Sequence, residues 1–122
     1  LTPYGKFPMM MDTFVNMGLQ MLAPMRHIKP VFPMPGGGTT QGHIEDVVKK
    51  FGNDVMIAAG GAIHGHPMGP AAGARAFRQG IDAVCKGRSL AEAAKEHEEL
   101  GAAVECWGIY TEDKTGLFDL KG

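Results

Sequence analysis

The sequence predicts an α/β fold, the C-terminal portion of a (β/α)8 TIM barrel, and two observations support this prediction. Two short apolar runs, at residues 31–34 and 55–59, each lead directly into glycines. A segment with helical spacing lies between them, so the order is strand, glycine loop, helix, strand, glycine loop. The loops after the last two strands of such a barrel often form a phosphate site. We therefore expect residues 1–122 to contain strands 7 and 8 with their following helices, without an internal domain boundary.

The length of the chain limits how much of a barrel it can form. A closed barrel takes ~250 residues, whereas this chain has 122 residues and two convincing parallel strands. The alternative is a self-standing small α/β domain, but a two-stranded parallel sheet would leave its edges and faces uncovered. We interpret the chain as the C-terminal part of a larger enzyme.

Composition excludes several classes of partner. With 12 Lys and Arg against 13 Asp and Glu, we expect neither nucleic acid nor an anionic membrane surface as a partner. No apolar run approaches the ~20 residues of a membrane span. Cys85 and Cys106 fit neither a disulfide framework nor a paired Cys-x-x-Cys metal motif. The cysteines therefore indicate a reduced, cytoplasmic setting.

The first two predicted helices flank the first apolar run. Residues 8–25 show helical spacing and end near Pro24, and their methionines predict a core or subunit contact. The apolar positions of this segment are Phe14, Met17, Met21 and Met25. Residues 43–51 form an amphipathic crossover helix, and Gly52 is placed to end it.

Two longer helices follow the second glycine cluster, which consists of Gly60 and Gly61. Pro70 is suited to the first helical position of a helix over 71–86, and Gly87 ends it. We expect this helix to bury Ala74, Phe77, Ile81 and Val84. Ser89 and Glu92 form a capping-box sequence that starts a single helix to Trp107. For residues 108–122 we expect loop structure or subunit packing.

The glycine clusters are candidate phosphate-binding loops. Glycine allows the chain to turn with φ > 0 and lets a ligand approach backbone N–H groups. Neither cluster matches the dinucleotide or P-loop fingerprints, so nucleotide binding is disfavoured. The alternative is that these glycines only permit tight turns. The candidate residues are Gly36, Gly37 and Gly38 in the first cluster and Gly60 and Gly61 in the second.

Lys6 is the candidate catalytic side chain. It lies in a segment bracketed by prolines and glycine, which indicates an exposed loop, and a lysine there is often merely solvated. If this loop lies at the same end as the glycine clusters, its ammonium could reach a phosphate or a developing enolate oxygen. His64 and His66, two apart in an extended turn, point to opposite sides, so we expect no shared metal but a local hydrogen bond from at least one.

Several strings resemble the C-terminal part of the ribulose bisphosphate carboxylase (RuBisCO) large-chain superfamily. They are Gly-Lys at 5–6, the run from Ile28 to Gly38, Phe-Gly-Asn-Asp-Val at 51–55, and Gly-Gly-Ala-Ile-His-Gly-His-Pro-Met-Gly-Pro-Ala-Ala-Gly-Ala at 60–74. The resemblance covers roughly residues 1–107. It implies the loop after strand 6 through strand 8 of a barrel, with the C-terminal helices.

The resemblance also implies roles for residues. Lys6 matches the mobile-loop lysine, Gly36 to Gly38 match the strand-7 loop at the substrate, and Gly60 and Gly61 match the strand-8 loop that binds a phosphate. It implies a Mg²⁺ cofactor whose ligands, including a carbamylated lysine, belong to strand 2, so no metal ligand is expected in this segment. It also implies a phosphorylated sugar substrate and a homodimer or higher homo-oligomer.

Three departures distinguish the chain from true carboxylases. Gly36 stands where a serine is usual, and Ala62 stands where a third glycine is usual. Phe7-Pro8-Met9 follows Lys6, where true carboxylases usually have an acidic residue close behind the loop lysine. These departures favour a RuBisCO-like enolase or isomerase of methionine salvage or sulfur metabolism. Its substrate would be a phosphorylated ketose such as 5-methylthioribulose 1-phosphate or its diketo relative, and this segment alone would be inactive. The alternatives are a true carboxylase, or a non-catalytic binding or assembly module.

Overall fold

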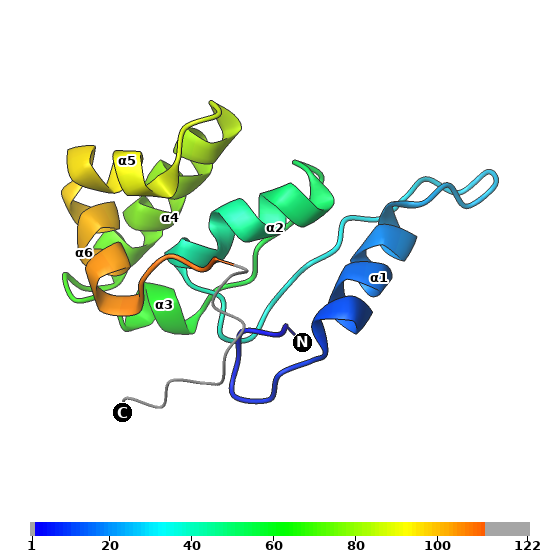
Figure 1. Cartoon of the computed structure of the whole chain (residues 1–122), viewed down its shortest axis with the longest axis horizontal. Coiled ribbons are helices and arrows are strands. Elements are labelled where there is room, and N and C mark those ends of the chain that lie inside the picture. Colours follow the sequence, from blue (N-terminus) through cyan, green and yellow to red (C-terminus); the bar gives the residue numbers. More distant parts are fainter. Residues whose placement is uncertain (1, 112–122) are drawn as a thin grey trace.

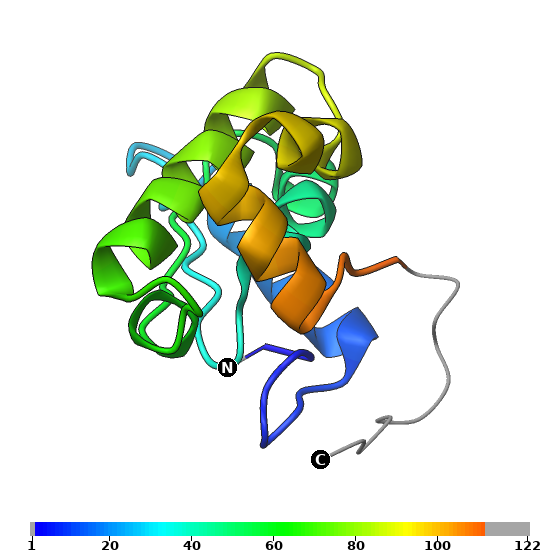
Figure 2. The ribbon, with the colours of Figure 1, turned by 90° about the vertical axis from the view of Figure 1, so that its left-hand side faces the viewer.

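The computed structural model describes residues 2–111 and consists of helices joined by extended segments (Figure 1). The helices are α1 (Met11–Leu22), the 3-10 turn η1 (Gln41–His43), α2 (Ile44–Phe51), α3 (Gly61–His64), α4 (Pro70–Cys85), α5 (Leu90–Glu96) and α6 (Glu98–Trp107). Helices α2 to α6 pack into one group, and α1 stands to its side (Figure 1). In this group α6 lies against both α4 and α5 (Figure 2).

The two predicted strands are extended and parallel, but their pairing is short. The N–H of Met56 donates to the carbonyl of Pro33 at 3.0 Å, and that of Ala58 donates to Pro35 at 2.9 Å. Gly36 and Ala58 form an isolated parallel bridge, and no longer strand is formed within residues 2–111. Proline has no N–H to donate. Pro33 and Pro35 therefore accept hydrogen bonds but cannot return them.

Helix α1 is shorter than the predicted 8–25 segment and exposes most of its methionines. It ends at Leu22, and Ala23 is extended because a residue before proline disfavours helical geometry. Met17, Met21 and Met25 are 44%, 37% and 43% exposed, so they do not belong to a core within residues 2–111, and the predicted alternative of a subunit contact stays a prediction. The inward side of α1 carries Phe14 and Gly18 instead.

Helices α2 and α4 agree with the sequence patterns, with one correction. Gly52 and Gly87 adopt φ of 70° and 73° beyond α2 and α4, and Pro70 begins α4. Ala74 is exposed, contrary to the prediction, and Ile81 and Val84 are only half-buried. The buried residues of α4 are Ala72, Gly73, Ala76, Phe77, Gly80 and Ala83. This side is made mostly of small residues because α4 lies close to its neighbours: a Cβ at Gly73 would be 2.8 Å from the Cα of Ile63.

The single helix predicted from Ser89 to Trp107 is two helices. Ser89 caps α5 by accepting a hydrogen bond from the Glu92 N–H at 3.2 Å, which confirms the serine half of the capping box. His97 is extended, with φ −120° and ψ 115°, and separates α5 from α6. The break allows α6 to fold back beside α5, where a Cβ at Gly101 would lie 2.7 Å from the Ala94 carbonyl oxygen.

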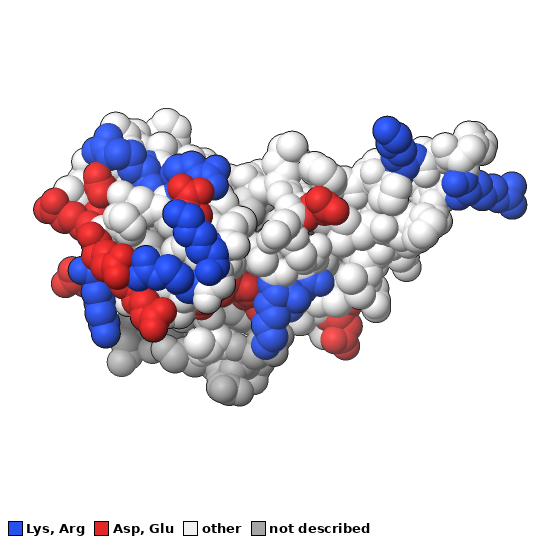
Figure 3. Space-filling model, turned by 90° about the horizontal axis from the view of Figure 1, so that it is seen from above, with Lys and Arg blue, Asp and Glu red and all other residues white. Residues whose placement is uncertain are grey.

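The core lies among α2, α4, α5 and α6, and the α1 side is apolar at its surface. Ile44, Leu90 and Leu100 are fully buried in the core. Most of the large exposed apolar side chains belong to residues 7–34: Phe7, Met10, Met17, Leu19, Met21, Met25, Ile28, Val31, Phe32 and Met34. Charged side chains gather over the opposite end of the molecule (Figure 3). Within residues 2–111, none of the helices combines the length and apolar character needed to cross a membrane.

The predicted tail lies mostly outside the described residues. Its first part, Gly108 to Thr111, follows α6 back toward α2. The N–H of Tyr110 donates to the carbonyl of Gly42 at 3.0 Å.

Candidate anion-binding site

The two glycine clusters converge on one pocket of ≈ 270 Å³. The parallel pairing of residues 33–36 with 56–58 brings the carboxyl ends of both extended segments to the same edge, where ligands of α/β folds bind. The pocket is lined by Gly37, Gly38, Thr39, Thr40, Ala58, Ala59, Gly60, Gly61, Ala62 and Trp107. Four of the five glycines selected from the sequence therefore line one pocket.

Gly36 does not line this pocket. It forms the parallel bridge with Ala58 beneath it, and a Cβ at Gly36 would lie 3.0 Å from the Ala58 Cβ. That distance is tighter than ordinary contact between real side chains. A glycine at this position therefore allows the two extended segments to approach closely.

Gly60 and Gly61 are glycines that the fold itself does not require. A Cβ at either position would meet no atom within 4 Å, and neither residue has a positive φ. The other described glycines with open space, Gly37, Gly52, Gly69, Gly87 and Gly108, all have φ between 70° and 104°. The small size of Gly60 and Gly61 therefore leaves free volume at the pocket.

Backbone N–H groups are the hydrogen-bond donors at this position. Ile63 and His64 donate to the Gly60 carbonyl at 3.1 and 3.0 Å, which closes the single turn of α3. The N–H groups at the start of a helix have no acceptor within it, and this applies to Gly61 and Ala62. All residues that line the pocket are uncharged. The pocket can therefore attract an anion through backbone dipoles rather than through a side-chain charge of its own.

Thr39, Thr40 and Trp107 line the pocket but were not selected from the sequence. The Thr39 hydroxyl is buried without a hydrogen-bond partner among the described residues, and the Thr40 hydroxyl lies 3.1 Å from His43 Nδ1. The two threonines directly follow the first glycine cluster, and this adjacency is a usable sequence signal. Trp107 is distant in sequence and joins the pocket only because α6 folds back.

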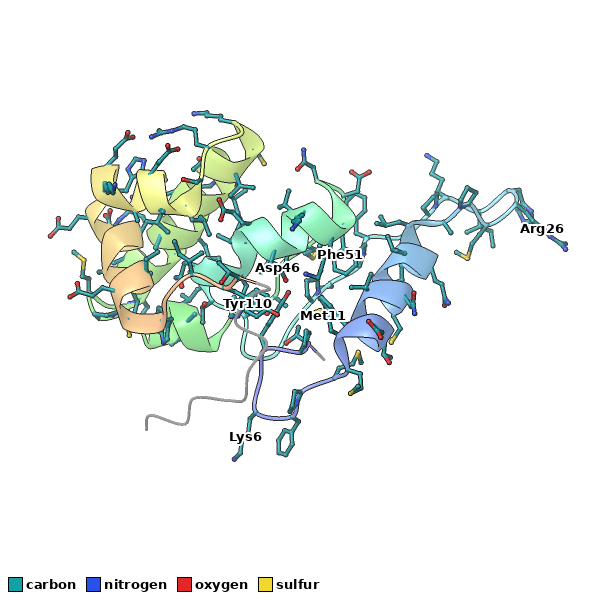
Figure 4. All side chains as sticks on the ribbon, in the orientation of Figure 1. Lys6, Met11, Arg26, Asp46, Phe51 and Tyr110 are labelled. Atoms are coloured by element: carbon teal, nitrogen blue, oxygen red, sulfur yellow. The ribbon has the colours of Figure 1, made fainter. Side chains whose placement is uncertain are left out.

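Lys6 does not line the pocket. Its side chain is exposed and points away from the body of the molecule (Figure 4). Its Nζ lies 5.7 Å from the centre of the Phe7 ring. The base of its loop, however, contacts the first glycine cluster, because the Thr2 hydroxyl donates to the Gly37 carbonyl and Gly5 packs on Gly37 and Gly38. The structure thus brings the loop, but not the ammonium, to the glycines.

His66 makes the local hydrogen bond that the sequence predicted. Its Nδ1 accepts from the Met68 N–H at 3.1 Å, so the ring proton is on Nε2, which lies 2.9 Å from the Glu99 carbonyl oxygen. His66 is buried, whereas His64 is exposed. Residues 2–111 contain no group of three or more His, Cys, Asp or Glu side chains that could hold a metal ion.

Residues 8–107 match the family model described as ribulose bisphosphate carboxylase large chain, catalytic domain. A ribulose bisphosphate carboxylase-like protein of Archaeoglobus fulgidus is 53% identical over 85 residues, which is 70% of this chain and 20% of the relative. A 2,3-diketo-5-methylthiopentyl-1-phosphate enolase of Exiguobacterium sibiricum is 40% identical over 108 residues, 88% of this chain and 27% of the relative. The chain thus spans about a fifth to a quarter of these relatives.

Solved structures give the same grouping. A RuBisCO-like protein from Alicyclobacillus acidocaldarius has a TM-score of 0.78 and 38% identity, covering 88% of this chain and 27% of that one. The octameric ribulose-1,5-bisphosphate carboxylase/oxygenase of Pyrococcus horikoshii has a TM-score of 0.71 and 40% identity, covering 77% of this chain and 22% of that one.

Proposed function

Because this chain belongs to the ribulose bisphosphate carboxylase large-chain family, we propose that it supplies the phosphate-binding loops of an enzyme that acts on a phosphorylated ketose. The observation that carries the proposal is the pocket at Gly60 and Gly61, two glycines that the fold does not require. The N–H groups of Gly61 and Ala62 would bind the phosphate, and Gly37 and Gly38 would lie beside it.

The wider architecture we propose is the C-terminal portion of a (β/α)8 barrel. The parallel pairing of Gly36 with Ala58, with α2 between the two extended segments, is the arrangement of consecutive barrel strands. The apolar surface over residues 7–34 would be covered by other elements of that barrel. We propose that the intact enzyme works as a homo-oligomer, as its octameric structural neighbour does.

The reaction we propose is enolisation of the ketose, in the manner of a RuBisCO-like enolase or isomerase. Two groups expected in a carboxylase are missing: the serine hydroxyl, because Gly36 stands at that position, and the acidic side chain after the loop lysine, because Phe7-Pro8-Met9 stands there. The similarity to the enolase of E. sibiricum covers 88% of the chain and supports this choice. Lys6 would contribute positive charge once its loop closes over the substrate.

Mg²⁺ is the cofactor implied by the family, and it would polarise the substrate carbonyl. The described residues do not bring together three side chains of the type that ligate a metal. They therefore do not fit a Mg²⁺ site, and we assign the ligands to other elements of the intact enzyme. This chain's own part is to bind and orient the phosphate.

The second candidate is a true carboxylase. The carboxylase of P. horikoshii is 40% identical to this chain, and the match covers 77% of this chain. Carbon dioxide fixation with ribulose 1,5-bisphosphate separates the candidates: fixation at a rate comparable to ketose enolisation would overturn the first. A non-catalytic assembly module predicts neither activity, even in the intact protein.

Trp107 provides the binding test, because it lines the pocket and is the single tryptophan of the chain. We expect inorganic phosphate to change its fluorescence, and Trp107→Phe to identify that signal. Gly61→Ala places a methyl group in the open space at the pocket and should keep the phosphate away from a backbone N–H. The expected loss of affinity is about 10–100-fold, the equivalent of one charge-assisted hydrogen bond of ~1.5–3 kcal/mol. The substitution should not reduce stability, because alanine favours a helix over glycine.

Gly52→Ala is the matched control. Its Cβ would also meet no atom within 4 Å, but Gly52 has a φ of 70° and does not line the pocket. We expect this variant to lose stability and to keep phosphate binding, the opposite of Gly61→Ala. Equal phosphate affinity in wild type, Gly61→Ala and Gly60→Ala would contradict the proposed site.

A further inference from the structure

A buried polar cluster lies outside the pocket, between the N-terminal segment and α2. Its centre is the carboxylate of Asp46, a residue that is 6% exposed. The Tyr4 hydroxyl donates to Asp46 Oδ2, and Lys50 Nζ donates to Oδ1. Figure 4 shows Asp46 and Tyr110 together at the junction of α2 with the N-terminal and C-terminal segments.

The Tyr4 ring is held on several sides. It stacks on His43, with 4.0 Å between ring centres, and meets Phe14 and Tyr110 edge-on at 5.8 and 5.2 Å. Burial lowers the pKa of His43 to about 4, so this imidazole is neutral at pH 7. The ring contacts position Tyr4, and the Asp46 carboxylate fixes where its hydroxyl points.

Tyr4 lies two residues before Lys6, between two other points of attachment. The Thr2 hydroxyl donates to the Gly37 carbonyl, and a Cβ at Gly5 would lie 2.7 Å from the Gly37 oxygen. The chain is therefore attached at Thr2, Tyr4 and Gly5, after which Lys6 and Phe7 are exposed. Of these attachments, the Tyr4–Asp46 bond is the one to a charged side chain.

We propose that Asp46, acting through the Tyr4 hydroxyl, is a positioning residue that holds the base of the Lys6 loop against the first glycine cluster. Its consequence for catalysis rests on the proposed function: a loop whose base is fixed would begin each closure over the substrate from the same position. A buried ion pair is a weak source of stability compared with apolar packing, whereas it can specify one arrangement. Asp46 and Lys50, with side chains 5% and 8% exposed, form such a pair.

The first test measures trypsin cleavage after Lys6 in the intact protein, without substrate. Tyr4→Phe keeps the ring contacts and removes the hydroxyl, and Asp46→Asn removes the charge. We expect each variant to speed cleavage after Lys6 about tenfold, by increasing the population of the detached loop. Lys86, an exposed residue just after α4 and outside the apolar surface of residues 7–34, is an internal control at which cleavage should not change.

The second test measures turnover of the phosphorylated ketose. Both variants should lower kcat about tenfold and change KM less than about twofold, since the loop acts after the substrate has bound. If Asp46 acts through Tyr4, Asp46→Asn should have little further effect in the Tyr4→Phe background. Asp82→Asn is the matched control, because Arg78–Asp82 is also an i,i+4 ion pair but lies on the exposed face of α4.

Three outcomes would overturn the proposal. Unchanged cleavage after Lys6 in both variants would show that the hydroxyl does not hold the loop. Equal acceleration after Lys6 and Lys86 would indicate general unfolding. Additive effects of the two substitutions on cleavage would show that Asp46 acts independently of Tyr4. If wild type turns over no phosphorylated ketose, the proposed function fails, while the cleavage data still decide whether Asp46 and Tyr4 position the loop.

Discussion

A Cβ atom at Gly38 would lie 2.8 Å from the backbone nitrogen of Gly5, so these two glycines bring backbone against backbone. The contact joins the segment before Lys6 to the loop that lines the pocket. Lys6 itself is exposed, but the start of its loop is fixed at the site. The placement of the candidate catalytic loop therefore depends on a residue pair with no side chains.

The first prediction concerns this contact. Gly38→Ala should lower the free energy of unfolding by about 2–5 kcal/mol, because an alanine at φ 74° is strained and its methyl group forces the two backbones apart. Gly52→Ala is also strained, at φ 70° and ψ −159°, but its methyl group would meet no neighbour, and it should cost about 1–3 kcal/mol. Urea unfolding measures both values, and equal losses would contradict the close contact.

The second prediction tests the role of Lys6. Lys6→Met in the intact enzyme should lower kcat by about 10–100-fold while KM changes by less than about threefold, because the charge is needed where negative charge develops. Lys95→Met, at an exposed position of α5 outside the apolar surface of residues 7–34, is the control and should keep wild-type kinetics. Wild-type turnover in the Lys6 variant would identify Lys6 as a solvated loop residue.

The third prediction concerns the start of α6. The Gln79 Oε1 accepts from the Leu100 N–H at 3.1 Å, and its Nε2 donates to Glu99 at 2.8 Å, so a residue of α4 caps α6. Gln79→Met keeps the apolar stem and should reduce stability by about 1–2 kcal/mol. Gln20→Met on the exposed side of α1 should leave the thermal midpoint within error, and a similar loss there would rule out a specific cap.

The fourth prediction is a dependence of stability on pH. Burial lowers the pKa of His43 from 6.5 to about 4, so the unfolded chain binds this proton before the folded chain does. The contribution of neutral His43 is complete above pH 6.5 and is lost as the pH falls toward 4, to a total on the order of 3 kcal/mol. Urea unfolding between pH 7 and 4 measures the slope.

His43→Gln is the comparison for this pH dependence. Glutamine does not titrate in this range, so the variant should flatten the slope between pH 6.5 and 4. Acid loss at lower pH should remain, since hydrogen bonds from Gln79 and Arg75 lower the pKa of Glu99 to about 2. An unchanged slope in His43→Gln would show that another group titrates.

Local sequence signals predicted several element boundaries correctly. Pro70 begins α4, Gly52 and Gly87 lie beyond the ends of α2 and α4 with positive φ, and Ser89 caps α5. Each of these signals acts within a few residues of the chain, through fixed φ, a missing Cβ or a short side-chain hydrogen bond. They therefore operate in the same way whatever the rest of the fold does.

The break at His97 had no such signal. The apolar spacing from Leu90 to Trp107 is continuous, and neither proline nor glycine stands at the break. The chain bends there because α5 and α6 each bury residues of the core, with Ala93 and Leu100 fully buried. Likewise, Ala74 is exposed because of where the neighbours of α4 lie, and the spacing of apolar residues along one helix does not predict the positions of its neighbours.

The sequence by itself determined the parts of the candidate site that are adjacent in the chain: two glycine clusters, each at the end of an extended apolar run. Only the tertiary structure decided that these clusters share a pocket with Trp107, and that Tyr4 meets Asp46, 42 residues away. The physical reason is that contacts between distant residues depend on the path of the whole chain. That path is set by packing among α2, α4, α5 and α6, which leaves no local pattern at the residues it brings together.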